Sequence, residues 1–158
     1  MSGAGAVTFG GLASAGEIGG PPIVEISITK TVAGTDPGIV FPITLTCDSQ
    51  GGGDMDLGTQ DFQIPNDGSA SEVVHLANGA STVVSVTLPE SEPDLATCRV
   101  TEDLSGTALP AGVTCTPSIT PESVVVYDGS ESQGGAFTVT NTCTQAAAAV
   151  EAVPVVTG

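Results

Sequence analysis

The sequence predicts an all-β fold, an immunoglobulin-like β-sandwich, and three observations support this prediction. Short runs that alternate apolar and polar residues follow one another from residue 23 to residue 143, as half-buried strands do. Turn-forming combinations of Gly, Pro, Asn and Asp separate these runs. No stretch has a convincing helical period, and the nearest, Gln145 to Ala152, is short and rich in alanine. Short strands with such turns are typical of a sandwich.

The first predicted strand, 24–32, alternates throughout and ends before the Gly- and Pro-containing turn 34–38. The later runs are rich in Val, Ile, Thr and Phe, as strands are. In order they are 39–47, 61–64, 71–76, 82–88, 95–104, 113–119, 123–127 and 136–143. Further turn signals are Asn66-Asp67-Gly68, Asn78-Gly79 and Asp128-Gly129.

A length of 158 residues predicts one domain, which we assign to residues 23–143. Residues 1–22 are mainly Gly, Ala and Ser, which is typical of a flexible N-terminal arm, and 144–158 form an Ala- and Val-rich tail. The start lacks the features of a signal peptide, and no apolar run is long enough for a bilayer. No membrane insertion is therefore expected.

Eighteen acidic residues against two basic ones give a net charge of −16 at pH 7. Contacts with phosphate groups need clustered Lys or Arg, so nucleic acid is not expected as a partner. The sequence contains no Ser–His–Asp order, no phosphate-binding loop and no recognisable pair of catalytic carboxylates. We therefore expect neither an enzyme with turnover nor a cofactor.

A metal site is not expected either. Asp54, Asp56 and Asp61 follow three glycines and offer oxygen ligands of the kind calcium prefers, but their spacing does not match an EF-hand loop. A solvated acidic loop is the better interpretation. His75, the only histidine, lies in the phase opposite Val74 and Leu76, so it is expected on the surface.

The four cysteines are Cys47, Cys98, Cys115 and Cys143, each in or beside a predicted strand. An even set in a small all-β chain predicts two disulfides and an oxidising, extracellular location. Four buried thiols in a cytosolic protein are the alternative. Cys98 and Cys115 are close in sequence and are expected to join adjacent strands, which leaves Cys47 for Cys143. Three connectivities are possible, and the sequence does not choose among them.

Lys30 is the only lysine, and it lies in the apolar phase of the first strand with Ile28 and Val32. Successive side chains of a strand point to opposite faces, so Lys30 is predicted to be buried. A buried ammonium is costly unless it is paired or chemically changed. Glu102 and Asn141 also lie in the inward phase of their strands.

Together these three residues predict an intramolecular isopeptide bond. A neutral Lys30 amine attacks the Asn141 side-chain carbonyl, while a protonated Glu102 polarises that carbonyl and transfers protons as ammonia leaves. Two alternatives stay open. One is a buried Lys30–Glu102 ion pair with Asn141 bonded to backbone groups, and the other is a wrongly assigned phase in one strand.

Three segments resemble motifs of CnaB-like domains, in the cysteine-containing variety of actinobacterial surface proteins. They are Ile28-Thr29-Lys30-Thr31-Val32, Cys98-Arg99-Val100-Thr101-Glu102 and Val139-Thr140-Asn141-Thr142. The resemblance covers residues 23–143 and implies an immunoglobulin-like stalk or pilin module. It also implies that Lys30 and Asn141 are the bonded pair and that Glu102 is the catalytic acid.

The expected function is that of an extracellular structural protein, a subunit or module of a cell-surface filament. Its expected partners are copies of itself or other surface proteins. A terminal extension, around 6–9 or 153–156, is a candidate to add a strand to a neighbour. An adhesin-type binding domain and a virion decoration protein are the alternatives, and the scarcity of aromatic residues, at 3%, disfavours the binding domain.

Overall fold

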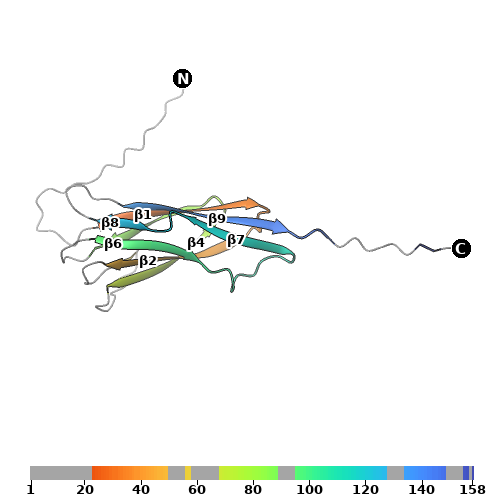
Figure 1. Ribbon diagram of the computed structural model, residues 1–158, viewed down its shortest axis with the longest axis horizontal. Helices are drawn as coiled ribbons and strands as arrows, with labels where there is room; N and C mark the ends of the chain where they lie inside the picture. The colour runs from red at the N-terminus through yellow and green to blue at the C-terminus, as the bar shows by residue number, and fades with distance from the viewer. Residues whose placement is uncertain are drawn as a thin grey trace, which may run out of the picture.

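The computed structural model describes residues 23–49, 56–57, 68–88, 95–127, 134–148, 155–156 and 158. Its strands form two sheets that pack face to face (Figure 1). One sheet has the strand order β3-β5-β1-β9-β7 and the other β4-β2-β6-β8. Within the described ranges no helix has the length and apolar character to cross a membrane. The predicted all-β sandwich is confirmed.

The strands are β1 Ile23–Gly34, β2 Val40–Ser49, β3 Asp56–Leu57, β4 Ser69–Ala77, β5 Ser81–Thr87, β6 Leu95–Glu102, β7 Val113–Thr120, β8 Val124–Tyr127 and β9 Gly135–Gln145. Eight predicted strands are present with ends within two residues of the expected ones. The ninth, 61–64, lies outside the described residues, as does the predicted arm 1–22. β3 was not predicted because two residues are too short to show an alternation.

The first and last strands are neighbours that run in the same direction. β1 lies in the middle of the five-stranded sheet, antiparallel to β5 and parallel to β9. Consequently β1 begins at one end of the sandwich and β9 finishes at the opposite end (Figure 1).

The core lies between the sheets and consists of inward-phase residues from both. Its largest members are aliphatic side chains with two phenylalanines, Phe41 and Phe137. Lys30 and Asn141 are the buried polar residues among those described, both with 0% exposure. The strand phases assigned to these two residues from sequence are therefore correct.

Two disulfides are present, but the predicted pairing is wrong. Cys47 is bonded to Cys98 across β2 and β6, and Cys115 to Cys143 across β7 and β9. The prediction assumed that Cys98 and Cys115 lie on adjacent strands because they are close in sequence. Residues 103–112 instead carry the chain from β6 in one sheet to β7 in the other, so each cysteine finds its partner within its own sheet.

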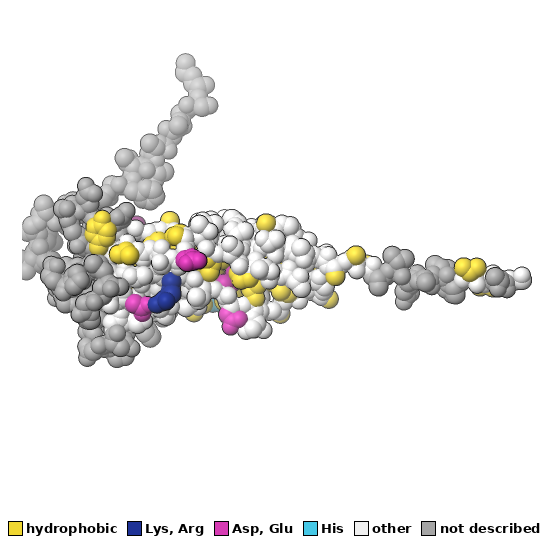
Figure 2. Space-filling view, viewed as in Figure 1, with side chains coloured by type: hydrophobic (Ala, Val, Ile, Leu, Met, Phe, Trp, Pro, Cys, Tyr) yellow, Lys and Arg dark blue, Asp and Glu magenta, His cyan; other side chains and the backbone are white. Residues whose placement is uncertain are grey.

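On the face in Figure 2, charged side chains are sparse and apolar ones are scattered. His75 is exposed, as predicted. Arg99 is also exposed and forms an ion pair with Asp48. No group of three or more His, Cys, Asp or Glu in the described part of the chain could hold a metal ion.

Candidate functional site

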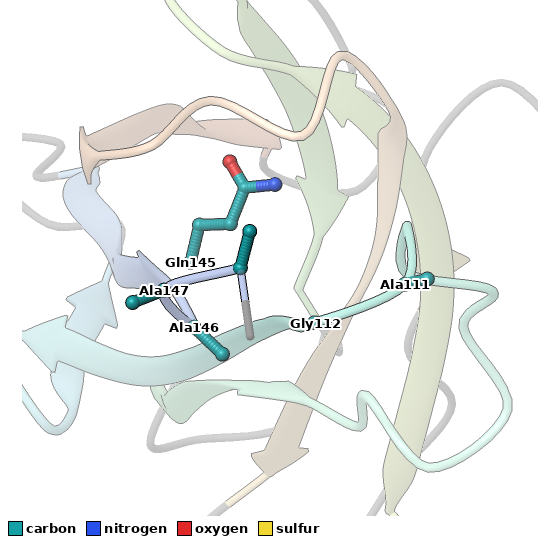
Figure 3. A pocket seen from close by; sticks show the side chains of 6 residues that line it. Ala111, Gly112, Gln145, Ala146 and Ala147 are labelled. Carbon is teal, nitrogen blue, oxygen red and sulfur yellow. The ribbon is translucent and has the colours of Figure 1, made fainter. Parts of the chain in front are cut away.

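A depression of about 680 Å³ lies where β9 ends, but its lining carries no reactive chemistry. It is formed by Ala111, Gly112 and residues 145–148 (Figure 3). Gln145 supplies the only polar side chain, and no lining residue titrates. Catalysis and metal binding need charged or nucleophilic groups, so this depression is not the candidate site.

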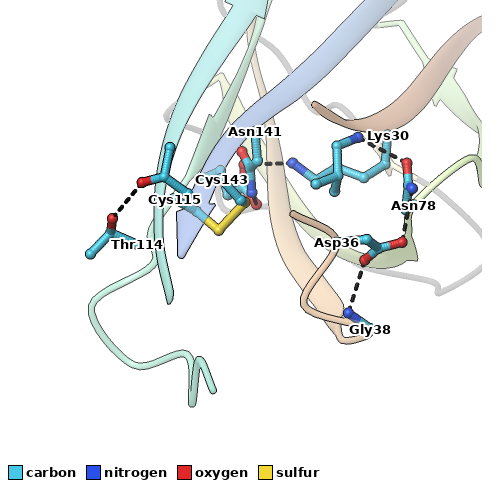
Figure 4. Close-up of a disulfide and its surroundings, with 11 residues drawn as sticks. Lys30, Asp36, Gly38, Asn78, Thr114, Cys115, Asn141 and Cys143 are labelled. Atoms are coloured by element: carbon cyan, nitrogen blue, oxygen red, sulfur yellow. Dashed lines mark hydrogen bonds and ion pairs between the residues drawn. A yellow bond between two sulfur atoms is a disulfide. The ribbon is translucent and has the colours of Figure 1, made fainter. Parts of the chain in front are cut away.

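Lys30, Glu102 and Asn141 meet inside the sandwich. Lys30 Nζ donates a hydrogen bond to Glu102 Oε2 at 3.1 Å, and Asn141 Nδ2 donates to Glu102 Oε1 at 3.0 Å. The side chains of Lys30 and Glu102 have no exposed area, and Asn141 is fully buried. One carboxyl group thus bridges an amine and an amide in a site closed to water. Figure 4 shows Lys30 and Asn141 together with the nearby Cys115–Cys143 disulfide.

The strands place each member of this group. Lys30 lies on β1 and Asn141 on β9, and the parallel register sets Lys30 opposite Val139, two residues before Asn141. Glu102 ends β6 in the opposite sheet. Its carboxyl group therefore reaches the other two residues from across the core.

Burial changes the chemistry of the amine. It lowers the pKa of Lys30, because loss of water disfavours the ammonium form, while the hydrogen bond and charge of Glu102 act in the opposite direction. The desolvation effect is the larger one. Since only the neutral amine is nucleophilic, this environment favours the reactive form.

Phe41 on β2 forms a further wall of the site. Its ring centroid lies 4.4 Å from Lys30 Nζ, and the residue has no exposed area. An aromatic face at this distance attracts a cation and excludes water. Sequence alternation placed Phe41 inside a strand but gave no sign that it contacts Lys30.

The turn between β4 and β5 holds the backbone of Lys30. Lys30 N donates to Ala80 O, and Gly79 N donates to Lys30 O, both at 2.9 Å. Gly79 has a φ of +78°, a conformation that L side chains rarely adopt. The Asn78-Gly79 signal predicted a turn, but its contact with Lys30 depends on long-range strand pairing.

Asn78, which lies in the turn before β5, supports the part of β1 that follows Lys30. Its Oδ1 accepts a hydrogen bond from Val32 N at 2.8 Å, and its Nδ2 donates to Asp36 Oδ2 at 2.9 Å (Figure 4). Asp36 in turn accepts from Gly38 N at 2.8 Å. These bonds lower the pKa of Asp36, that from Gly38 N more than that from Asn78. β1 is thereby fixed on both sides of Lys30.

The carbonyl oxygen of Asn141 has no hydrogen-bond partner among the described residues, although it is buried. Buried polar atoms usually have one. The structure thus contains the buried Lys30–Glu102 ion pair of one alternative, but Asn141 bonds to Glu102 and not to the backbone groups which that alternative required. Because Glu102 bonds to Nδ2, this oxygen can accept a hydrogen bond from a protonated Glu102 only if the amide rotates.

Comparisons with known proteins give likenesses of fold alone. No family model and no curated protein matches this chain. A pilus-presented adhesin is similar with a TM-score of 0.43 and 17% identity, covering 75% of this chain and 27% of that one. The major pilin T3.2 of Streptococcus pyogenes gives 0.39 and 20%, covering 75% and 44%.

A second major pilin of Streptococcus pyogenes gives a TM-score of 0.34 and 22% identity, covering 77% of this chain and 47% of that one. This chain thus spans less than half the length of each of these proteins. With TM-scores below 0.5, the likenesses assign no function and no family.

Proposed function

We propose that this chain is an extracellular structural module of a cell-surface assembly, closed internally by an isopeptide bond between Lys30 and Asn141. The observation that carries the proposal is the position of Glu102, whose two carboxyl oxygens each bond to one reactant. All three side chains are closed to water. The motifs that resemble CnaB-like domains contain the same three residues.

The reaction follows from this arrangement. Lys30 transfers a proton to Glu102, and the resulting amine attacks Cγ of Asn141. The proton on Glu102 stabilises the charge that develops on the carbonyl oxygen. The bond between Cγ and Nδ2 then breaks, and ammonia leaves with a proton taken from the attacking nitrogen. The products are a neutral amide, ammonia and one proton retained by Glu102. The reaction occurs once per molecule, so the proposal involves no turnover.

The strand order gives this bond a mechanical use. Tension applied at the start of β1 and the end of β9 loads two adjacent parallel strands in shear. A bond between Lys30 and Asn141 carries that tension directly from one strand to the other. The chain between these residues then remains unloaded, which suits a module within a filament or stalk.

The two disulfides support an oxidising location outside the cell. We propose copies of this chain or other surface proteins as its partners. Strand donation by a terminal extension stays a prediction, because residues 6–9, 153 and 154 lie outside the described ranges. Val155 and Val156 are described and are 86% and 89% exposed. Such apolar side chains are of the kind a donated strand buries.

Intact mass of the denatured, reduced chain tests the central proposal. The bond predicts a mass about 17 Da below that of the sequence, because one ammonia is lost. Lys30→Met and Asn141→Ala chains serve as controls and are expected at full mass. Full mass for the unmodified chain after reduction overturns the proposal.

A further inference from the structure

Each of the two described sheets has two outer strands, one short and one long. β7 is an outer strand of the five-stranded sheet, and β4 is an outer strand of the four-stranded sheet. An open edge presents unpaired N–H and C=O groups to which another strand can bond. β8 has four residues and β3 two, so β4 and β7 are the longer edges.

The positions of the cysteines show which backbone groups of β4 point outward. In antiparallel pairs, directly opposite residues lie about 4.5 Å apart between Cα atoms where they do not exchange hydrogen bonds, and about 5.5 Å where they do. Cys47 and Cys98 are opposite each other at 4.0 Å. The backbone of Cys47 therefore bonds to β4, where its partner is Ala70.

Counting alternately from Ala70, the residues that direct N–H and C=O away from the sheet include Ser71, Val73 and His75. No described backbone group pairs with them. All three side chains are exposed, and Val73 is 52% exposed. The one acidic residue of this strand, Glu72, lies in the inward phase. The outward-directed residues of β4 thus include no Asp, Glu, Lys or Arg, and none of them is a proline, so each offers both an N–H and a C=O group.

β7 is different because a proline interrupts its outer row. Cys115 and Cys143 are opposite each other at 4.1 Å. By the same reasoning, Cys115, Pro117 and Ile119 direct their backbone groups outward. Pro117 has no N–H to offer, and proline at such a position protects an edge against pairing. β4 contains neither proline nor lysine.

We propose that two copies of this chain pair through β4, antiparallel and about a two-fold axis at Val73. β4 has nine residues, and Val73 is the central one. A two-fold axis can pass between two facing residues that exchange both of their backbone hydrogen bonds, and Val73 directs its backbone groups outward as such a pair requires. The two exposed valines then bury each other. Ser71 lies opposite His75 of the second copy, so no two acidic side chains face each other on the outer face.

This pairing goes beyond the proposed function, because it does not depend on the bond between Lys30 and Asn141. It joins two four-stranded sheets into one continuous sheet. Each copy carries a net charge of −16, so the copies repel one another at low salt. Association is therefore expected to increase with ionic strength.

Sedimentation of the full chain over a range of concentrations tests whether two copies pair through β4. The unmodified chain is expected to approach twice the monomer mass, whereas Val73→Pro stays monomeric because it removes one outward N–H without breaking a bond to β2. Val125→Pro is the matched control. Val125 is also 52% exposed, and it directs its N–H outward from β8 because Cys98 bonds to Val124. Equal association of all three chains, or a monomeric unmodified chain at high salt, overturns the proposal.

Cysteine trapping identifies what occupies the edge. A Val73→Cys chain is expected to form a disulfide-linked dimer on oxidation, because hydrogen-bonded residues lie within the Cα separation that a disulfide spans. Val125→Cys is expected to stay monomeric. The proposal is wrong if Val73→Cys fails to crosslink while the unmodified chain self-associates. In that case the copies associate through a terminal extension or through a surface other than the β4 edge. Intact mass of the same samples reports the Lys30–Asn141 bond separately.

Discussion

Glu102 holds both partners of the proposed bond, one on each carboxyl oxygen. Glu102→Gln keeps the shape of the side chain but cannot take the Lys30 proton. We expect this chain at full mass, without the loss of about 17 Da. An Asn141→Ala chain keeps Lys30 unbonded and paired with Glu102, whereas Glu102→Gln leaves the Lys30 ammonium without a counter-ion. Relative to Asn141→Ala, we expect Glu102→Gln to lower the free energy of unfolding by about 3–5 kcal/mol. Mass spectrometry and urea unfolding measure the two effects.

Glu25→Gln is the matched control, since Glu25 is an exposed acid on β1. It is expected to change neither quantity. A Glu102→Gln chain that still loses ammonia would show that Glu102 is not needed for the reaction.

Lys30 also makes stability depend on pH when it stays unbonded. Burial holds its pKa below the ordinary value of 10.5. Between the lowered pKa and 10.5, the unfolded chain binds more protons than the folded one, so the free energy of unfolding rises with pH. A bonded Lys30 has no titrating amine and contributes nothing to this rise.

We therefore expect Asn141→Ala to gain stability relative to the unmodified chain as the pH rises from the lowered pKa of Lys30 to its ordinary value of 10.5. Urea unfolding at several pH values measures the difference. The contributions of groups that are common to both chains cancel in this difference. Two curves that stay parallel over this range would contradict the prediction.

At the scale of the strands, each disulfide joins neighbours within one sheet. Cys115–Cys143 fastens β7 to β9, its one neighbour among the described strands, and closes a loop with a sequence separation of 28. Replacing both cysteines with alanine is expected to lower the free energy of unfolding by about 3–4 kcal/mol through chain entropy. The mass loss from the Lys30–Asn141 bond should persist, because β1 and β9 position that pair.

Calorimetry and intact mass check these outcomes. The Cys47 and Cys98 double alanine chain is the comparison, with a sequence separation of 51 and an expected loss of similar size, about 4 kcal/mol. If the Cys115 and Cys143 change abolishes the mass loss, the disulfide positions the reactants and our assignment to β1 and β9 is wrong.

The strands also show which features the sequence can predict. The inward positions of Lys30, Glu102 and Asn141 follow from alternation, which is a local property of each strand. The disulfide pairing depends on which sheet each strand joins, and proximity in sequence did not reveal that β6 and β7 belong to different sheets. The contacts of Phe41 and Asn78 with β1 arise from the same long-range arrangement, so no local sequence pattern could predict them.

At the scale of the whole molecule, the proposed bond divides the chain into loaded and unloaded parts. Pulling on both ends of the unmodified protein is expected to release almost none of the segment between Lys30 and Asn141. With both disulfides reduced, an Asn141→Ala chain is expected to release that whole segment, roughly 370–400 Å of extended backbone. The intact Cys47–Cys98 and Cys115–Cys143 bonds would keep most of the segment closed, so both chains are pulled under reducing conditions. Force spectroscopy of tandem copies measures this length, and equal release from both chains would contradict the prediction. Glu25→Gln again serves as the control.

The burial of Lys30 has a further consequence for the access of proteases and amine-directed reagents to this chain. Trypsin-like proteases cut after lysine or arginine, and this sequence contains one of each. Lys30 has no exposed area, and Arg99 lies within β6, where its backbone belongs to a sheet. Aldehydes and other amine-directed reagents likewise find no lysine on the folded surface. The folded chain therefore offers trypsin-like proteases no cleavage site outside a strand, and it offers amine-directed reagents no exposed lysine side chain.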